Sequence, residues 1–341
     1  MSSFTWPETL AMLVRGENLD EERAGAAMRS IMSGEATAGQ IGGFLVALRA
    51  KGETVDEITG LARVMREFSL KVPYDGPVVD TCGTGGDGAG TVNISTMAAL
   101  VVAGAGVKVA KHGNRAASST CGSADLLEAL GVTLEVGPDG VAACIEEAGI
   151  GFCFAPAFHP AMKHAGPVRR ELGVPTVFNF LGPLTNPAGA EYQTVGCSDA
   201  DMAPRIAEAL LRLGAKHAMV FRSHDGLDEL STGSSSKVWE IDGGVRPWTL
   251  DPGALGIPTS AAGDLAGGSP ADNATIAVVV MEGQTGPVRE AVALNAGAAL
   301  YVVGAAADMD EGVARARQAI DSGAALRALE TLREVSARVA G

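Results

Sequence analysis

The sequence predicts an α/β protein with a small N-terminal α-helical domain and a large α/β domain, whose central sheet is mostly parallel, mixed, and flanked by helices. Three observations support this prediction. The first 70 or so residues carry helical periodicity with almost no strand signal. From residue 73 onward, short β-rich runs alternate with helical ones, which is typical of α/β domains. A glycine-rich loop follows the first of those β-rich runs.

The helical domain is expected to contain four helices within residues 1–72. Thr37 and Gln40 form a capping-box pattern ahead of apolar residues at helical spacing, and Thr54 and Glu57 repeat that pattern. Two earlier helices are expected around residues 8–17 and 20–33. We expect a later segment near residues 160–176 to join this domain.

The α/β domain is expected to span residues 73–341, and its strands are predicted from apolar, β-branched runs. A strand, a Gly-Gly turn and a second strand are predicted over 236–250, which would make the sheet mixed. Further helices are predicted over 201–214 and from 309 to the C-terminus. The remaining predicted strands read "PVVDTC", "VKVAKH", "VTLEV", "GFCFAP", "HAMVF" and "TIAVVVM".

The composition restricts the classes of function. The formal net charge of −14 argues against general nucleic-acid binding, which requires a basic face. The five dispersed cysteines contain no CxxC pair and are typical of free thiols in a reducing compartment. We find no signal-peptide pattern and no apolar run long enough to span a membrane. We therefore expect a cytoplasmic enzyme or binding protein that uses neither nucleic acid nor membrane.

The loop "GTGGDG" formally matches the dinucleotide-binding pattern GxGxxG. A dinucleotide fold also needs an acidic residue about 20 positions later, but "VKVAKHGNR" is basic there. The loop could still direct backbone N–H groups and the N-terminus of a helix beginning near Asn93 toward an anion. Asp87 would repel a phosphate and should face a ribose hydroxyl or a cation. A purely structural glycine turn remains an alternative.

A second candidate anion loop follows between residues 111 and 123. It combines cations, amides and hydroxyls with a helix expected to start near Ser123. Two such loops about 30 residues apart indicate a ligand with two separate phosphate groups.

The motifs "GTGGD", "NIST", "KHGNR", "HPAMKH", "FNFLGPLTNP", "DGLDE" and "LNAGAALYV" occur in this order along the chain. In this combination the sequence closely resembles the anthranilate phosphoribosyltransferase family over essentially its whole length. The resemblance implies a helical domain hinged to the α/β domain, a homodimer and the use of Mg²⁺, with two ions expected per monomer. The implied reaction transfers phosphoribosyl from phosphoribosyl pyrophosphate to anthranilate in tryptophan biosynthesis.

The resemblance also implies roles for matching residues. Anthranilate would contact Gly83, Asn114 and Arg169, while Ser95 would bind one Mg²⁺, and Asp228 and Glu229 another. The general base is not identified. The phosphoribosyl pyrophosphate site would comprise Gly83, Gly86, Asp87, Thr91, Asn93, Ile94, Ser95, Thr96, Lys111, His112, Gly113, Asn114, Arg115, Ala116, Ala117, Ser118, Ser119 and Ser123.

The residue types suit this chemistry, although each also has a structural interpretation. Adjacent acids can bind Mg²⁺ but in an acidic chain usually form a solvated face. Arg169 could hold a carboxylate or lie on the surface, and His112, His159 and His164 could line the acceptor site or serve packing alone.

The sequence departs from the family pattern at Pro175, where arginine is usual, and at Ser223 and His224 near the DGLDE motif. These changes bear on loop shape and the acceptor side. A nucleoside phosphorylase on the same fold and a catalytically silent nucleic-acid-binding relative are the alternatives. Intact acidic motifs and the negative charge oppose them.

Overall fold

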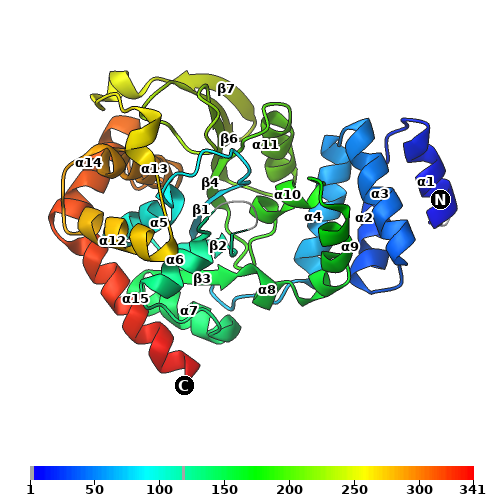
Figure 1. Cartoon of the computed structure of the whole chain (residues 1–341), viewed down its shortest axis with the longest axis horizontal. Helices are drawn as coiled ribbons and strands as arrows, with labels where there is room; N and C mark the ends of the chain where they lie inside the picture. The colour runs from blue at the N-terminus through cyan, green and yellow to red at the C-terminus, as the bar shows by residue number, and fades with distance from the viewer. Residues whose placement is uncertain (1–3, 117–119) are drawn as a thin grey trace.

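The computed structural model describes residues 4–116 and 120–341. A helical unit lies at one end of a larger α/β unit (Figure 1). The helical unit comprises α1 (Trp6–Val14), α2 (Glu21–Met32), α3 (Ala38–Lys51) and α4 (Val55–Phe68). The later helix α9 (Gly166–Leu172) packs against α3. The segment before α9 also reaches the helical unit, because a Cβ placed on Gly34 would lie only 2.7 Å from the His164 ring.

Both predicted capping boxes form. The Thr37 side chain accepts a hydrogen bond from the Gln40 backbone N–H, and Gln40 Oε1 accepts from Thr37 N at 2.9 Å. Thr54 and Glu57 exchange the equivalent pair of bonds at the start of α4. These bonds satisfy backbone donors that the first helical turn leaves unpaired, so the two sequence patterns fix where α3 and α4 begin.

The α/β unit is built on a mixed seven-stranded sheet with the order β3-β2-β1-β4-β5-β6-β7. The first five strands in this order are parallel, and β6 and β7 extend the sheet as the predicted antiparallel hairpin. The strands are β1 (Val79–Gly83), β2 (Val109–Gly113), β3 (Ile150–Phe154), β4 (Tyr192–Gly196), β5 (His217–Ser223), β6 (Ser236–Asp242) and β7 (Val245–Leu250).

Helices cover the two faces of the sheet and create two main cores. On one face, strand residues such as Val79 and Phe221 pack with α5 and α13. On the other face, Cys82 and Val195 share a core with α11 and with the helical unit. The helices of this unit are α5 (Ile94–Gly104), α6 (Ser123–Ala129), α7 (Gly137–Ala148), α8 (Ala155–Phe158), α10 (Phe178–Leu181), α11 (Met202–Arg212), α12 (Pro270–Met281), α13 (Pro287–Val302), α14 (Met309–Asp321) and α15 (Ala324–Ala340).

Two predicted strands are wrong, and one strand was missed. The run "TIAVVVM" lies inside α12, which begins with a capping box between Ser269 and Asp272. The run "VTLEV" has no regular structure. The missed strand, β4, lies at the centre of the sheet between β1 and β5. The α12 error arose because β-branched residues also suit a buried helix face, so a short apolar run does not by itself distinguish a strand from a helix.

Within the described part of the chain, no helix is both long and apolar enough to cross a bilayer. All five cysteines lie within the described residues, where they are buried and no disulfide joins any two of them.

Candidate active site

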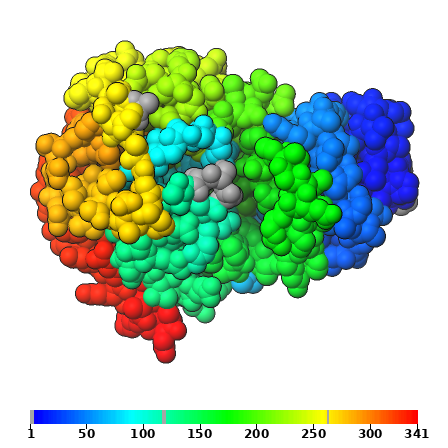
Figure 2. Space-filling view, viewed as in Figure 1, coloured from blue at the N-terminus to red at the C-terminus, as the bar shows by residue number. Residues whose placement is uncertain are grey.

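The residues of interest gather where four neighbouring strands end. Gly83 ends β1, Gly113 ends β2, Gly196 ends β4 and Ser223 ends β5. This edge is where parallel α/β sheets place their ligands. The glycine-rich segment after β1 lies open at the surface in Figure 2, where it is cyan. The yellow segment beside it precedes α12 and is joined to it by the Gly267 N–H, which donates to Gly90 O at 2.8 Å.

Backbone conformation explains why this loop is rich in glycine. Gly85, Gly86, Gly88 and Gly90 all have φ between 64° and 83°, a region that other residues rarely adopt. The start of the loop is anchored by hydrogen bonds from outside it. Gly85 N donates to Asp228 Oδ2 at 2.7 Å, and Ser198 Oγ donates to Gly85 O at 2.8 Å.

The adjacent acids Asp228 and Glu229 lie against this loop and against α5. Glu229 Oε1 accepts from Ser95 N at 3.1 Å, in the first turn of α5. Asp87 reaches the same place, since the Asp228 N–H approaches Asp87 Oδ2 at 3.5 Å. The structure therefore brings the predicted metal residues Ser95, Asp228 and Glu229 together.

The electrostatics of this acidic group favour a cation. Burial, and then repulsion from Asp87, raises the pKa of Asp228. Burial, and then repulsion from Asp228, raises the pKa of Glu229. Burial and mutual repulsion thus both disfavour the charged forms of these acids, although Lys111 partly offsets this at Glu229, and a divalent cation would oppose both shifts. The described residues contain no cluster of three or more His, Cys, Asp or Glu side chains able to hold a metal alone. A sparse set of oxygen ligands suits Mg²⁺, which usually keeps waters and binds substrate phosphates.

Two glycines allow the acids to approach the strand ends. A Cβ on Gly196 would lie 1.6 Å from Asp228 O, and one on Gly83 would lie 2.5 Å from Asp228 Oδ2. Neither position has room for a side chain while Asp228 stays in place. Gly196 is therefore part of the site, although it contributes no functional group.

The start of α5 differs from the expectation for a capped helix. Asn93 precedes the helix, but its amide donates to Cys121 O at 3.0 Å and accepts from Asn273 at 2.9 Å. The side chain thus ties the two predicted anion loops together. Thr96 Oγ1 is buried and has no hydrogen-bond partner among the described residues.

Lys111 and His112 occupy the end of β2. Lys111 is only 2% exposed, and its ammonium group donates to Thr81 O. Burial lowers its pKa, although Asp80 and Glu229 act in the opposite direction. Burial and the neighbouring His159 lower the pKa of His112 to about 3. Because a carbonyl can only accept, His112 Nδ1 donates to Gly182 O at 3.1 Å, which leaves Nε2 unprotonated and without a partner.

The second predicted loop leads from β2 to α6. Ser123 Oγ bonds to both the N–H and the carbonyl of Asn114 at 3.2 Å. Arg115 is exposed and forms ion pairs with Asp125 and Glu128, so its guanidinium is already engaged by carboxylates. Ala116 N donates to Asp125 at 2.9 Å. The predicted residues Ala117, Ser118 and Ser119 lie outside the described residues.

Arg169 lies on α9, beside the helical unit. Its guanidinium stacks on the Phe178 ring at 5.1 Å, and burial lowers its pKa. No hydrogen bond or ion pair engages this side chain within the described residues. Arg169 is thus a half-buried cation with free donors. Pro175 is exposed in the turn between α9 and α10.

Sequence reasoning missed several residues that position the site. Asp80 is fully buried and accepts bonds from His112 N and from the Asn186 side chain. Ser198 and Gln193 belong to the missed strand β4 and the segment after it. The one available signal was Asp80 itself, a carboxylate inside an apolar strand, since such groups are rarely buried without partners.

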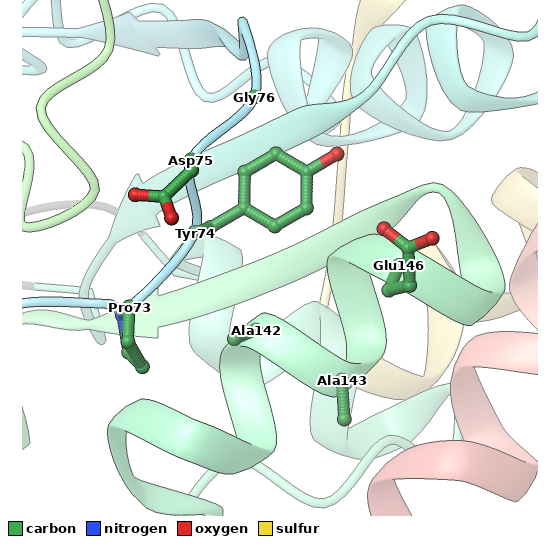
Figure 3. A pocket seen from close by; sticks show the side chains of 7 residues that line it. All are labelled: Pro73, Tyr74, Asp75, Gly76, Ala142, Ala143 and Glu146. Atoms are coloured by element: carbon green, nitrogen blue, oxygen red, sulfur yellow. The ribbon is translucent and has the colours of Figure 1, made fainter.

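A shallow hollow of about 490 Å³ lies away from this edge of the sheet, between the segment 73–76 and α7. Its polar lining groups are Tyr74, Asp75 and Glu146, as Figure 3 shows. It contains no cation and no glycine-rich loop, and a polyanion would meet carboxylates there. The strand ends therefore remain the candidate site.

Comparisons with known proteins agree with this geometry. Residues 7–69 match the model for the helical bundle domain of a glycosyl transferase family, and residues 75–326 match the α/β domain of that family. The chain is 54% identical to the anthranilate phosphoribosyltransferase of Salinispora arenicola, over 98% of each chain. This chain belongs to the anthranilate phosphoribosyltransferase family. The family match also confirms the predicted fold class, a helical domain followed by a large α/β domain.

Solved structures of anthranilate phosphoribosyltransferases extend the likeness to three dimensions. The Thermus thermophilus enzyme superposes with a TM-score of 0.91 at 48% identity, covering 96% of this chain and 99% of that one. The Saccharomyces cerevisiae enzyme superposes with a TM-score of 0.89 at 29% identity, covering 98% of each chain. That structure contains phosphoribosyl pyrophosphate and Mg²⁺, and another yeast structure contains 4-fluoroanthranilate.

Proposed function

We propose that this chain transfers the phosphoribosyl group of phosphoribosyl pyrophosphate to the amine of anthranilate. The products are N-(5-phosphoribosyl)anthranilate and pyrophosphate, and the reaction is a step of tryptophan biosynthesis. One observation carries the proposal: Asp228 and Glu229 lie against both the glycine-rich loop and the first turn of α5. This arrangement joins a pyrophosphate-binding backbone to oxygen ligands for a metal.

The donor is proposed to occupy the two loops that follow β1 and β2. Positive φ at four glycines supports close approach of the backbone to phosphate oxygens. Asp87 faces the acids, which suits a ribose hydroxyl or a metal better than a phosphate. The proposed donor residues are Gly83, Gly86, Asp87, Thr91, Asn93, Ile94, Ser95, Thr96, Lys111, His112, Gly113, Asn114, Arg115, Ala116, Ala117, Ser118, Ser119 and Ser123.

Mg²⁺ is proposed as the cofactor, with two ions per monomer. Ser95 would hold one ion, and Asp228 and Glu229 would hold the other. Oxygens of phosphoribosyl pyrophosphate would supply further ligands. When bound, the metal would neutralise the charge that develops on the departing pyrophosphate. The raised pKa values of the two acids support this assignment, because burial and mutual repulsion disfavour their charged forms and a bound cation would relieve that repulsion.

Anthranilate is proposed to contact Gly83, Asn114 and Arg169. The free donors of Arg169 suit the carboxylate of the acceptor, which two parallel N–H groups can hold in a fixed orientation. The ribose carbon gains oxocarbenium character as pyrophosphate leaves, so an oriented amine can attack it directly. Catalysis then rests on orientation and electrostatic stabilisation rather than on a covalent nucleophile. The proton acceptor is not assigned.

The active form is proposed to be a cytoplasmic homodimer joined through the helical unit. Val14 on α1 is 78% exposed and Val46 on α3 is 46% exposed. The partly buried Leu10 lies beside α3, because a Cβ on Gly43 would approach its side chain at 3.6 Å. An exposed apolar face on these two packed helices supports burial against a second copy. We also propose the domain boundary at residues 72 and 73, with a hinge there and near 160–176.

The experiment that tests this function is product identification. Purified protein with anthranilate, phosphoribosyl pyrophosphate and Mg²⁺ should release pyrophosphate and form phosphoribosylanthranilate in equal amounts, as measured by chromatography and a coupled pyrophosphate assay. A parallel reaction with pyrimidine nucleosides and inorganic phosphate tests the phosphorylase alternative. Nucleoside cleavage without transfer to anthranilate would overturn the proposal.

A further inference from the structure

Arg66 links the helical unit to the α/β unit in an unusual way. It lies on α4, yet its Nε donates to Leu184 O at 2.6 Å and its Nη1 to Leu213 O at 3.1 Å. No carboxylate forms an ion pair with it in the described ranges 4–116 and 120–341. Burial lowers its pKa, and the nearby Arg63 acts in the same direction. A cation without a counter-ion is a costly way to join two units, because apolar packing would avoid its desolvation.

Leu184 belongs to a segment that we call the 182–186 loop. Two of its carbonyls and one of its side chains form hydrogen bonds with residues of the sheet. Gly182 O accepts from His112 Nδ1 at 3.1 Å, and Pro183 O accepts from Gln193 at 2.8 Å. Asn186 Nδ2 donates to Asp80 Oδ2 at 2.8 Å and to Ala110 O at 2.7 Å.

Asp80 connects this loop to His112 in a network of hydrogen bonds, which we call the circuit. Its Oδ1 accepts from the His112 N–H at 3.1 Å, while its Oδ2 accepts from Asn186. Both the ring and the backbone N–H of His112 are therefore tied to the 182–186 loop. Asp80 is fully buried, so water cannot replace these bonds at low cost.

The circuit continues to the residues proposed for the acceptor. Gly113 and Asn114 directly follow His112. A Cβ on Gly113 would lie 2.2 Å from Ser123 Oγ, so the backbone here packs closely against the first residue of α6. Asn114 is itself held by Ser123 Oγ through two bonds. A displacement of the 182–186 loop would thus reach Asn114.

We propose that Arg66 is a positioning residue that sets the acceptor end of the site relative to the helical unit, acting through the 182–186 loop. The inference rests on the proposed function. His112, Gly113 and Asn114 belong to the proposed donor site as well as to this circuit. The rest of that site, the glycine-rich loop and Glu229, is anchored through Ser198, Asp228 and Ser95, which lie outside the circuit, so donor binding should be affected less than acceptor binding. Arg66 contributes to orientation and touches no reacting atom.

The decisive variant is Arg66→Lys. It keeps the positive charge, but a single ammonium group cannot reproduce the planar fork that serves two separate carbonyls. Arg63→Lys is the matched control on the same helix, since Arg63 is exposed and pairs with Glu21 inside the helical unit. Arg212→Gln is the control for the interface itself, because it removes the exposed ion pair between Arg212 on α11 and Asp56 on α4 without touching the 182–186 loop.

Four quantities should be measured for each variant. They are kcat and KM for anthranilate at saturating donor, the dissociation constant of phosphoribosyl pyrophosphate with Mg²⁺, and that of anthranilate with Mg²⁺ and pyrophosphate in place of the donor. For Arg66→Lys we expect kcat/KM for anthranilate to fall by about tenfold and the dissociation constant of anthranilate to rise by about tenfold. This is the change that the loss of one charged hydrogen bond would cause. The dissociation constant of the donor should stay within about twofold, and both controls should resemble the wild type.

Three results would overturn the inference. The first is unchanged anthranilate kinetics in Arg66→Lys, and the second is equal weakening of donor and acceptor binding in that variant. The third is the same loss of kcat/KM in Arg212→Gln, because any loosening of the contact between the two units would then have the same effect. If Arg66→Lys does not fold, Asn186→Ala tests the other half of the circuit, because it removes the bond to Asp80 Oδ2 but keeps the Asp80 charge beside Lys111, and it should give the same split between acceptor and donor. Failure of the wild type to bind either substrate would sink the proposed function instead.

Discussion

Gly196 at the end of β4 offers a test in which the perturbation adds only one methyl group. The residue supplies no functional group to the site, and its position permits the close approach of Asp228. Gly196→Ala should therefore damage activity through geometry alone. Gly244→Ala is the matched control, because a Cβ at that position in the β6–β7 turn meets nothing within 4 Å.

The size of the effect follows from the distances. The new Cβ would lie 1.6 Å from Asp228 O, and contacts below 3.0 Å are essentially never observed, so the separation must grow by about 1.4 Å. The neighbouring atom is backbone and cannot swing away as a side chain would. A displacement of about 1 Å in a catalytic site can cost about a hundredfold in rate. Overpacking costs about 1–3 kcal/mol, which a domain with a typical stability of about 5–15 kcal/mol survives.

The assay combines steady-state kinetics with urea unfolding. Gly196→Ala should lose about a hundredfold in kcat/KM, need more Mg²⁺ for half-maximal rate, and unfold cooperatively with a free energy lowered by about 1–3 kcal/mol. Gly244→Ala should match the wild type in all three. Wild-type kinetics and Mg²⁺ dependence in folded Gly196→Ala would refute the reasoning, because Asp228 would then function after displacement.

Three further predictions follow from the site and the helical unit. Folding raises the pKa of Asp228 and Glu229, so the native state binds more protons than the unfolded state. Without metal, the free energy of unfolding should therefore fall as pH rises from about 4 through the raised pKa values. Urea titrations in EDTA should show a smaller fall in Asp228→Asn/Glu229→Gln, and an equal fall in that variant would show that other groups cause it. Arg169→Gln should raise KM for anthranilate by about tenfold or more with little change in donor affinity, and weaker donor binding instead would argue against the acceptor role. Val14→Glu/Val46→Glu should give a monomer in light scattering, and an intact dimer would exclude this face as the interface.

The elements that the sequence predicted well are those whose signal is local. The Thr37–Gln40 and Thr54–Glu57 boxes lie at the starts of α3 and α4, because such caps act through bonds three residues apart. The same signal was present at Ser269 and Asp272 and would have identified α12 as a helix. The β-branched run that follows obscured it.

The positioning residues of the site could not be predicted in this way. Ser198, Asp80 and Asn186 act through contacts between residues more than 100 positions apart, which no local pattern encodes. The resemblance to known motifs identified Asp228 and Glu229. It did not reveal that Asp228 packs closely against Gly196, or that Arg115 pairs with Asp125 and Glu128. Those features depend on how the loops pack.

The most direct test of the central claim is the time course of anthranilate fluorescence with phosphoribosyl pyrophosphate and Mg²⁺, run beside Asp228→Asn/Glu229→Gln. We predict donor-dependent loss of signal in the wild type, abolished by EDTA and reduced by at least about a hundredfold in the double variant. No loss at high wild-type concentration, or full activity in the double variant, would contradict the assignment of these acids to a metal-assisted phosphoribosyl transfer.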